Sequence, residues 1–262
     1  MSRIVIRCGN YFGQKYDGVM NSSNMILRYY NNKESYVGKD LYSTLWNLYY
    51  KHQNIESSQK RVTVGGDHST SIASLAWTLN NYPDSKVIWI DAHADINTFE
   101  SSKSKNYHGM PLSFLSGLDS NKNFDFIKNK LDLNNLLYVG LRDLDDFEKD
   151  IIDKKNIKCV DVNTFNSRNF NDINNFIENS NYHLSFDVDA IDPKDMPCTG
   201  TPVENGIKLD SFLYFLESLD MENMINMDIV ELNLEMGKPN DFEISLKNIR
   251  KIEETLSNRF ES

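Results

Sequence analysis

Two short segments hold the residue types that bind metal ions. They are Asp91-Ala-His93-Ala-Asp95 and Ser185-Phe-Asp187-Val-Asp189. Each follows a short apolar run, residues 87–90 and 183–186, that predicts a buried strand. Alternate side chains of an extended chain point the same way, so the Asp and His side chains within each segment should converge if the chain stays extended past its strand.

A third segment, Gly65-Gly66-Asp67-His68, adds an imidazole after a further strand-like run at residues 61–64. The three segments together offer two imidazoles and four carboxylates. That much negative charge cannot share one apolar site without cations, which predicts a pair of divalent metal ions. Carboxylate oxygens with only two imidazoles favour Mn²⁺ over Zn²⁺, and no cysteine lies in these segments.

Strand-like and helix-like patterns alternate along the whole chain. Strand-like runs occur at residues 4–7, 61–64, 87–90, 136–139, 158–162, 183–186 and 227–230. Between them, apolar residues recur at helical spacing, as at Ile72, Leu75, Ala76 and Leu79. This alternation predicts an α/β fold with parallel strands and helices on both faces of the sheet. No linker or internal repeat is evident, so we expect a single domain over residues 1–262.

Polar residues follow five of these strands at the point where each ends. In open parallel sheets, ligands bind beyond the carboxyl ends of the strands. The agreement between independent segments is therefore stronger evidence for a site than any one motif. The residues are His68, Asp91 with His93 and Asp95, Arg142 with Asp143 and Asp145, Asp187 with Asp189, and Glu231.

Composition excludes several classes of function. The net charge is −10 and the pI about 5.0, which argues against nucleic-acid and anionic-membrane partners. Three widely spaced cysteines without a CxxC motif indicate reduced thiols in a cytoplasmic compartment. No apolar run of 18 residues exists, and the first residues resemble a strand more than a signal peptide.

Several of these residues also have simpler explanations. His108 could be an ordinary loop histidine, although the following Gly109 and Pro111 suit a loop over the site, where it would carry protons. Asp145 and Glu148 have the spacing of a helix N-cap and its reciprocal partner. Glu231 could be a salt-bridge partner. His52 is interpreted as structural, with a charge that suits the end of a helix.

At these residues the chain resembles the ureohydrolase family of arginases, agmatinases and formiminoglutamases, and arginases most closely. The match runs in family order over roughly residues 61–250. Its motifs are Gly65-Gly-Asp-His68-Ser, Asp91-Ala-His-Ala-Asp-Ile-Asn97, His108-Gly-Met-Pro, Gly140-Leu-Arg-Asp143-Leu-Asp145, Ser185-Phe-Asp-Val-Asp189, Gly200-Thr201-Pro-Val and Glu231 within Ile-Val-Glu-Leu-Asn.

The resemblance implies a three-layer α/β/α fold with a mostly parallel sheet of about eight strands, and two Mn²⁺ ions per chain. It assigns His68, Asp91, Asp95 and Asp187 to one ion. It assigns His93, Asp91, Asp187 and Asp189 to the other, so that Asp91 and Asp187 bridge the two. It also implies a homo-oligomer, a trimer or a hexamer.

The resemblance further implies hydrolysis of the guanidinium group of L-arginine to L-ornithine and urea by a metal-bridging hydroxide. Asp95 would pass a proton to the leaving amine, His108 would relay protons to solvent, and Glu231 would hold the guanidinium. The implied contacts to the remainder of this small guanidino substrate are Asn97, Ser102, Ser104, Asn106, Asp145, Glu148 and Thr201.

Two alternatives remain open. The chain could cleave agmatine, guanidinobutyrate or formiminoglutamate, or it could be a metal-binding pseudoenzyme. Asp145 and Glu148 match the ammonium contacts of arginases, which favours arginine. Two positions depart from the arginase pattern: Ser102 stands where arginases usually have Thr, and Lys105 where they usually have Gly.

Overall fold

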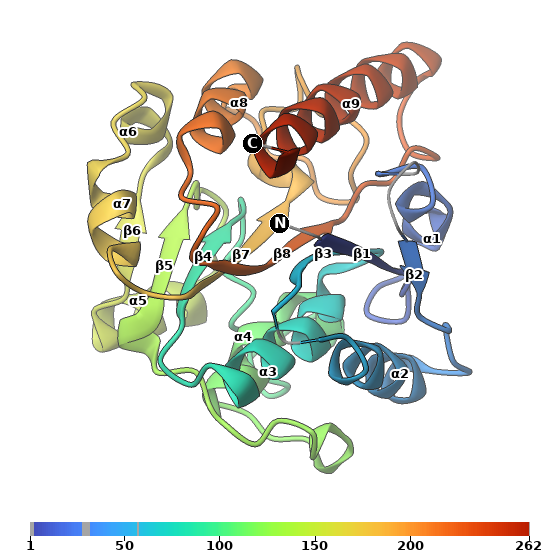
Figure 1. The fold of residues 1–262 in the computed structure, drawn as a ribbon, viewed down its shortest axis with the longest axis vertical. Coiled ribbons are helices and arrows are strands. Elements are labelled where there is room, and N and C mark those ends of the chain that lie inside the picture. The colour runs from blue at the N-terminus through green and yellow to red at the C-terminus, as the bar shows by residue number, and fades with distance from the viewer. Residues whose placement is uncertain (1–2, 28–31, 57, 262) are drawn as a thin grey trace.

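The computed structural model describes residues 3–27, 32–56 and 58–261, and a parallel β-sheet forms its centre (Figure 1). Eight strands of the described residues lie in the order β2-β1-β3-β8-β7-β4-β5-β6, and each neighbouring pair is parallel. Their bounds are β1 Arg3–Cys8, β2 Asn32–Glu34, β3 Lys60–Gly65, β4 Lys86–Ile90, β5 Leu136–Val139, β6 Lys158–Val160, β7 Tyr182–Asp187 and β8 Met224–Val230. The predicted α/β class and parallel sheet are confirmed.

Helices cover both faces of this sheet (Figure 1). Helices α2, α3 and α4 pack into one apolar core, and α7, α8 and α9 into another on the opposite face. This is the three-layer α/β/α arrangement. The helices are α1 Gly18–Ser23, α2 Leu41–Gln53, α3 Ser71–Asn81, α4 Pro111–Ser116, α5 Asp146–Lys155, α6 Val162–Asn166, α7 Asn171–Ile177, α8 Leu209–Ser218 and α9 Pro239–Glu261.

Strand β4 shows why the apolar runs form buried strands. Val87 and Trp89 point into the core beneath α2, α3 and α4, whereas Ile88 and Ile90 point into the opposite core. All four side chains are fully buried. A strand covered on both faces needs a continuous apolar run, which is the pattern that its sequence has.

Two strands differ from the sequence prediction. The edge strand β2 has only three residues, which are too few to show a hydrophobic pattern. The run expected over residues 158–162 ends as β6 at Val160. The next residue, Asp161, accepts hydrogen bonds from the backbone N–H groups of Asn163 and Thr164, and this cap starts α6 instead.

The charged role expected for His52 is wrong. The side chain is fully buried at the end of α2 and stacks against Trp77, with ring centroids 5.5 Å apart. Burial, together with the nearby charge of Arg61, lowers the pKa of His52 to about 3. A neutral imidazole has no favourable interaction with the helix dipole, so His52 contributes by packing.

Among the described residues, no helix combines the length and apolar composition that crossing a bilayer requires.

The turn after β3 depends on a close backbone approach. Gly66 follows β3, and a Cβ added there would lie 1.9 Å from the backbone oxygen of Asn10. That same oxygen accepts a hydrogen bond from the backbone N–H of Asp67. Only a residue without a side chain lets the loop after β1 and the turn before His68 lie this close.

We therefore predict that Gly66→Ala destabilises the fold, by roughly 1–3 kcal/mol or more, because either the turn or the loop must move. Gly109→Ala is the matched control, since a Cβ there meets nothing within 4 Å. Urea denaturation of both variants tests the prediction. Equal free energies of unfolding for the two would contradict it.

Candidate metal centre and substrate cavity

The predicted metal-ligand segments meet at the carboxyl ends of adjacent strands in the middle of the sheet. His68 follows β3, Asp91 follows β4 and Asp187 ends β7, while Glu231 follows β8. In the sheet order these four strands are consecutive. Parallel strands bring their carboxyl ends to one edge, so residues up to 163 positions apart in the sequence come into contact.

The side chains converge, but not by the extended chain that alternation predicted. The chain bends at residues 91–93, and Asp95 has a left-handed backbone with φ of 50°. Asp189 lies in a short 3₁₀ helix, Val188–Ala190. Carboxylates that point outward from straight strands would be farther from one another, and these bends fold them back over the sheet edge.

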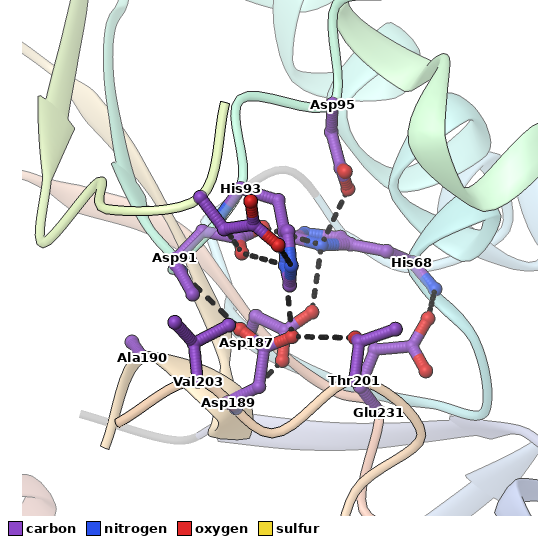
Figure 2. Close-up of polar contacts among 12 residues, drawn as sticks. His68, Asp91, His93, Asp95, Asp187, Asp189, Ala190, Thr201, Val203 and Glu231 are labelled. Atoms are coloured by element: carbon purple, nitrogen blue, oxygen red, sulfur yellow. Dashed lines mark hydrogen bonds and ion pairs between the residues drawn. The ribbon is translucent and has the colours of Figure 1, made fainter. Parts of the chain in front are cut away.

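The first ligand group surrounds the ring of His68. Its Nδ1 lies 3.1 Å from Asp91 Oδ2, 3.0 Å from Asp95 Oδ2 and 3.1 Å from Asp187 Oδ2 (Figure 2). One N–H cannot point at three oxygens, and this buried nitrogen makes no well-directed hydrogen bond in the part of the chain that the structure describes. Three acceptors around one nitrogen are the arrangement of a metal site.

Two contacts fix the orientation of the His68 ring. The ring stacks on Trp89, with centroids 4.1 Å apart and planes 6° from parallel. Its other nitrogen, Nε2, lies 2.8 Å from the hydroxyl of Ser185. Ser185 therefore holds the far side of the ring, and Nδ1 faces the carboxylates.

The second ligand group forms around His93. Its Nδ1 lies 3.4 Å from Asp91 Oδ1 and 3.1 Å from Asp189 Oδ2. Asp91 therefore presents one oxygen to each group and is shared between them. Asp187 contributes Oδ2 to the first group, while its Oδ1 accepts the backbone N–H of Asp189 at 2.7 Å. A bridging role for Asp187 stays a prediction.

The electrostatics of the two groups favour the binding of cations. Burial, and the charges of Asp189 and Asp91, raise the pKa of Asp187 well above its usual value. Burial and the charge of Asp91 raise the pKa of Asp95 to about 6. Burial lowers the pKa of His68, but the surrounding carboxylates outweigh it and raise that pKa well above normal. Each shift expresses an excess of buried negative charge that a divalent ion would remove.

The distances fit a metal ion. Bonds of about 2.1 Å to an octahedral ion separate neighbouring ligand atoms by roughly 3.0 Å. His68 Nδ1 lies 3.0–3.1 Å from its three carboxylate oxygens. The donor set of carboxylates and imidazoles suits a hard or borderline divalent cation.

Above the ligands lies a cavity of about 250 Å³. His93, Asp95, Asp187 and Asp189 reach its floor, whereas His68 and Asp91 are buried beneath it. Its wall includes all three predicted catalytic residues and several predicted substrate contacts. The lining residues are His93, Asp95, Asn97, His108, Gly109, Asp143, Asp145, Glu148, Asp187, Asp189, Thr201 and Glu231.

Three predicted substrate contacts lie outside this wall. The Ser102 and Ser104 hydroxyls are 3.5 Å apart and accept the backbone N–H groups of Lys105 and Asn106, so they are engaged within their own loop. Lys105 has a left-handed φ of 60°, the conformation that glycine favours, so the loop keeps this backbone although the residue is lysine. Contacts of Ser102, Ser104 and Asn106 with a substrate stay predictions.

Asp145 and Glu148 cap a helix and also line the cavity. Asp145 Oδ1 accepts the backbone N–H of Glu148 at 3.0 Å, and Glu148 Oε2 accepts the backbone N–H of Asp145 at 3.1 Å, which starts α5. The second oxygen of Asp145 accepts a hydrogen bond from Asn97 Nδ2 at 2.8 Å. The cap uses one oxygen of each carboxylate, so it does not exclude a role in binding.

Glu231 lies across the cavity, with its carboxylate in contact with three segments of the chain. Oε1 accepts the backbone N–H of His68 at 2.8 Å and lies 3.1 Å from His108 Nδ1. Burial lowers the pKa of His108, but Glu231 outweighs it and raises that pKa to about 9. Thr201, another predicted contact, donates its hydroxyl to Asp189 Oδ2 at 3.0 Å and so holds a predicted metal ligand.

Sequence reasoning missed Gln14. Its Nε2 donates to Glu231 Oε2 at 2.7 Å across 217 residues of sequence. No local pattern marks this glutamine, because the loop after β1 reaches the site only in the folded chain.

Comparison with known proteins identifies close relatives. The chain matches the sequence model of the Arginase family over residues 14–246. Arginase from Glaciozyma antarctica (strain PI12) is 37% identical over 201 residues, which cover 72% of this chain and 58% of the relative. Arginase from Neurospora crassa is 36% identical over 206 residues, with the same 72% and 58% coverage. The chain thus spans less than two thirds of the length of these curated relatives.

A solved structure is similar over nearly the whole of both chains. The crystal structure of Entamoeba histolytica arginase in complex with L-ornithine has a TM-score of 0.88 and 27% identity, and the match covers 98% of this chain and 99% of that chain.

The shared position of Asp91 predicts how metal binding responds to mutation. Protein loaded with Mn²⁺ should retain about two ions per chain, as in two-metal hydrolytic sites. Asp91→Asn should lower the affinity for both ions by at least about tenfold. Asp161→Asn is the control, because this exposed carboxylate caps α6 and does not line the cavity. Metal analysis after dialysis gives the counts. A single ion bound to the wild type, or two retained by Asp91→Asn, would refute the shared site.

The raised pKa of Glu148 predicts that the free energy of unfolding depends on pH. Burial, opposed by the hydrogen bond from Asp145 and reinforced by Asp95, raises its pKa from 4.5 to about 7. A carboxyl group whose pKa is higher in the folded state than in the unfolded state favours folding at pH values below its unfolded-state pKa. That contribution to stability is lost as the pH rises through the folded-state pKa. Glu148→Gln keeps the cap but cannot ionise. Metal-free Glu148→Gln should therefore gain on the order of 2 kcal/mol relative to wild type between about pH 4 and pH 8.

Denaturation curves across this pH range measure the difference, with exposed Glu217→Gln as the control. A constant difference between Glu148→Gln and wild type would show that Glu148 ionises normally.

Proposed function

We propose that this chain, which belongs to the arginase family, hydrolyses the guanidinium group of L-arginine to L-ornithine and urea. The observation that carries the proposal is the pair of ligand groups that share Asp91 directly beneath a cavity walled by Glu231. A buried carboxylate opposite a two-metal site is what a cationic, planar substrate group requires for binding and orientation.

We assign the cofactor as two Mn²⁺ ions. His68, Asp91, Asp95 and Asp187 would hold one, and His93, Asp91, Asp189 and Asp187 the other. Ions bound there would lower the pKa of a bound water molecule and so supply hydroxide near neutral pH. The rest of the reaction falls to side chains of the chain itself.

Glu231 would bind the guanidinium through charge-assisted hydrogen bonds and present its carbon to the nucleophile. The net reaction consumes one water molecule, and a proton must reach the departing amine. Asp95 lines the cavity floor, and its carboxylate would take that proton and deliver it. His108, whose side chain is 21% exposed, lies between Glu231 and solvent and would exchange the proton with bulk water.

The residues in and beside the cavity wall favour an α-amino acid as the substrate. Asp145 and Glu148 supply negative charge for an α-ammonium group, and Asn97 lies 2.8 Å from Asp145. We propose that Asn97, Ser102, Ser104 and Asn106 receive the α-carboxylate. Thr201 lies beside Asp189 at the floor and would contact the guanidinium side.

We also propose that residues 1–262 act as one domain, because site residues come from segments as far apart as Gln14 and Glu231. We propose a cytoplasmic location from the three widely spaced cysteines, and a trimer or hexamer of identical chains from the family resemblance.

A panel of guanidino compounds tests the function. With Mn²⁺ added, the protein should release urea from L-arginine with a kcat/KM at least tenfold above that for agmatine, guanidinobutyrate or formiminoglutamate. Glu231→Gln should abolish turnover and leave the metal content unchanged, because Glu231 is outside both ligand groups. A preference for agmatine would assign the chain to another ureohydrolase activity, and no turnover with two ions bound would favour a pseudoenzyme.

Asp145→Asn tests the choice of arginine. Asparagine retains an oxygen for the helix cap but removes the charge. We predict a fall of at least tenfold in kcat/KM for L-arginine and little change for any guanidine without an α-ammonium. Asp161→Asn, an exposed cap of α6 away from the cavity, controls for cap chemistry. Equal losses on both kinds of substrate would leave Asp145 as a cap only.

A further inference from the structure

The carboxylate of Glu231 has a third partner that the proposed mechanism does not use. Glu231 is 2% exposed, and its Oε1 faces the backbone N–H of His68 and the ring of His108. Its Oε2 accepts the side-chain amide of Gln14 at 2.7 Å. Gln14 is thus the only one of these three groups that holds Oε2, the other half of the carboxylate.

The loop that carries Gln14 is fixed on both sides. The preceding Gly13 donates its N–H to Asp67 Oδ2 at 2.7 Å, and its carbonyl accepts the N–H of His108 at 3.2 Å. A Cβ at Gly13 would lie 2.5 Å from Asp67 Oδ1, so the loop packs tightly against the turn before His68. The backbone that places Gln14 is therefore anchored to the same turn and helix that carry two site histidines.

The other end of the Gln14 amide lies near the loop of Thr201. A Cβ at Gly200 would be 3.3 Å from Gln14 Oε1. The amide group therefore lies between Glu231 and the segment that supplies Thr201. A side chain in this position connects two walls of the cavity.

Counting acceptor positions shows what Gln14 leaves free. A carboxylate has about four lone-pair directions, and the three observed partners occupy three of them. The remaining one belongs to Oε2. Because the amide of Gln14 is neutral, it orients the carboxylate without cancelling its charge, whereas a lysine or arginine there would form a complete ion pair.

We infer that Gln14 is a positioning residue for guanidinium recognition: it holds Oε2 of Glu231 so that the last acceptor position of the carboxylate faces the cavity. This inference rests on the proposed function, and it names the group that determines how a guanidinium is bound. Gln14 acts through Glu231 and does not contact the reacting atoms.

Gln14→Met and Gln14→Lys separate this role from simple packing. Methionine keeps the length of the side chain but donates no hydrogen bond. The KM for L-arginine should rise about tenfold, with a smaller change in kcat, because a hydrogen bond to a charged group is lost. Lysine restores a donor but neutralises Glu231, and KM should rise further, to about a hundredfold.

Binding of L-norvaline, an α-amino acid without a side-chain cation, should stay unchanged in both variants, as should metal content. Gln53→Met is the matched control, because Gln53 donates its amide to Tyr49 far along α2. A packing role predicts instead that Gln14→Met and Gln14→Lys lose stability, metal and affinity for both ligands together, and that result would overturn the inference.

Calorimetric titration of the Mn²⁺-loaded protein with guanidinium chloride separates this inference from the proposed function. Guanidinium should bind the wild type more tightly than Gln14→Met, whichever guanidine is hydrolysed. If the wild type releases no urea, the proposed function fails and this titration still decides the role of Gln14. Equal guanidinium affinity in wild type and Gln14→Met would refute that role.

Discussion

The site depends on one electrostatic constraint, which is the burial of four carboxylates around two imidazoles. Asp91, Asp187 and Asp189 are almost completely inaccessible to solvent. Their mutual repulsion in a low-dielectric interior would favour protonation or unfolding unless cations compensate it. The roles proposed for the other acidic cavity residues depend on a centre whose charge has been balanced in this way. These residues include Glu231, Asp145 and Glu148.

The surrounding structure holds this charge in place through a buried polar network. Behind His68, Ser185 lies 3.3 Å from the hydroxyl of Ser71, which donates to Asp228 Oδ2 at 2.8 Å. The same Asp228 oxygen faces His183 Nε2 at 3.0 Å. Because each of these groups is partnered, the polar chain between α3 and the sheet is tolerated in the core, and it fixes the ligand that it supports.

Two residues of the site have a left-handed backbone. Asp95 and Glu231 have positive φ values of 50° and 67°, which are uncommon for residues with a side chain. Each follows a strand and turns its carboxylate toward the cavity. Glu231 is held there by its N–H bond to the Gly66 carbonyl at 2.7 Å, so the tight turn at Gly66 also supports the wall of the cavity.

The sequence alone determined the fold class and the metal-binding residue types. Short continuous apolar runs that alternate with helical patterns favour buried parallel strands, and Asp and His directly after such strands then lie at the edge where the strands end. The tertiary structure decided the rest. Three features depend on bends in the chain and on the order of the strands. They are the position of Asp91 between the two ligand groups, the placement of Asp189 in the second ligand group, and the contact between Gln14 and Glu231. Sequence periodicity describes neighbours along one element, whereas these contacts join segments up to 217 residues apart. Their geometry is set by packing, which no local pattern encodes.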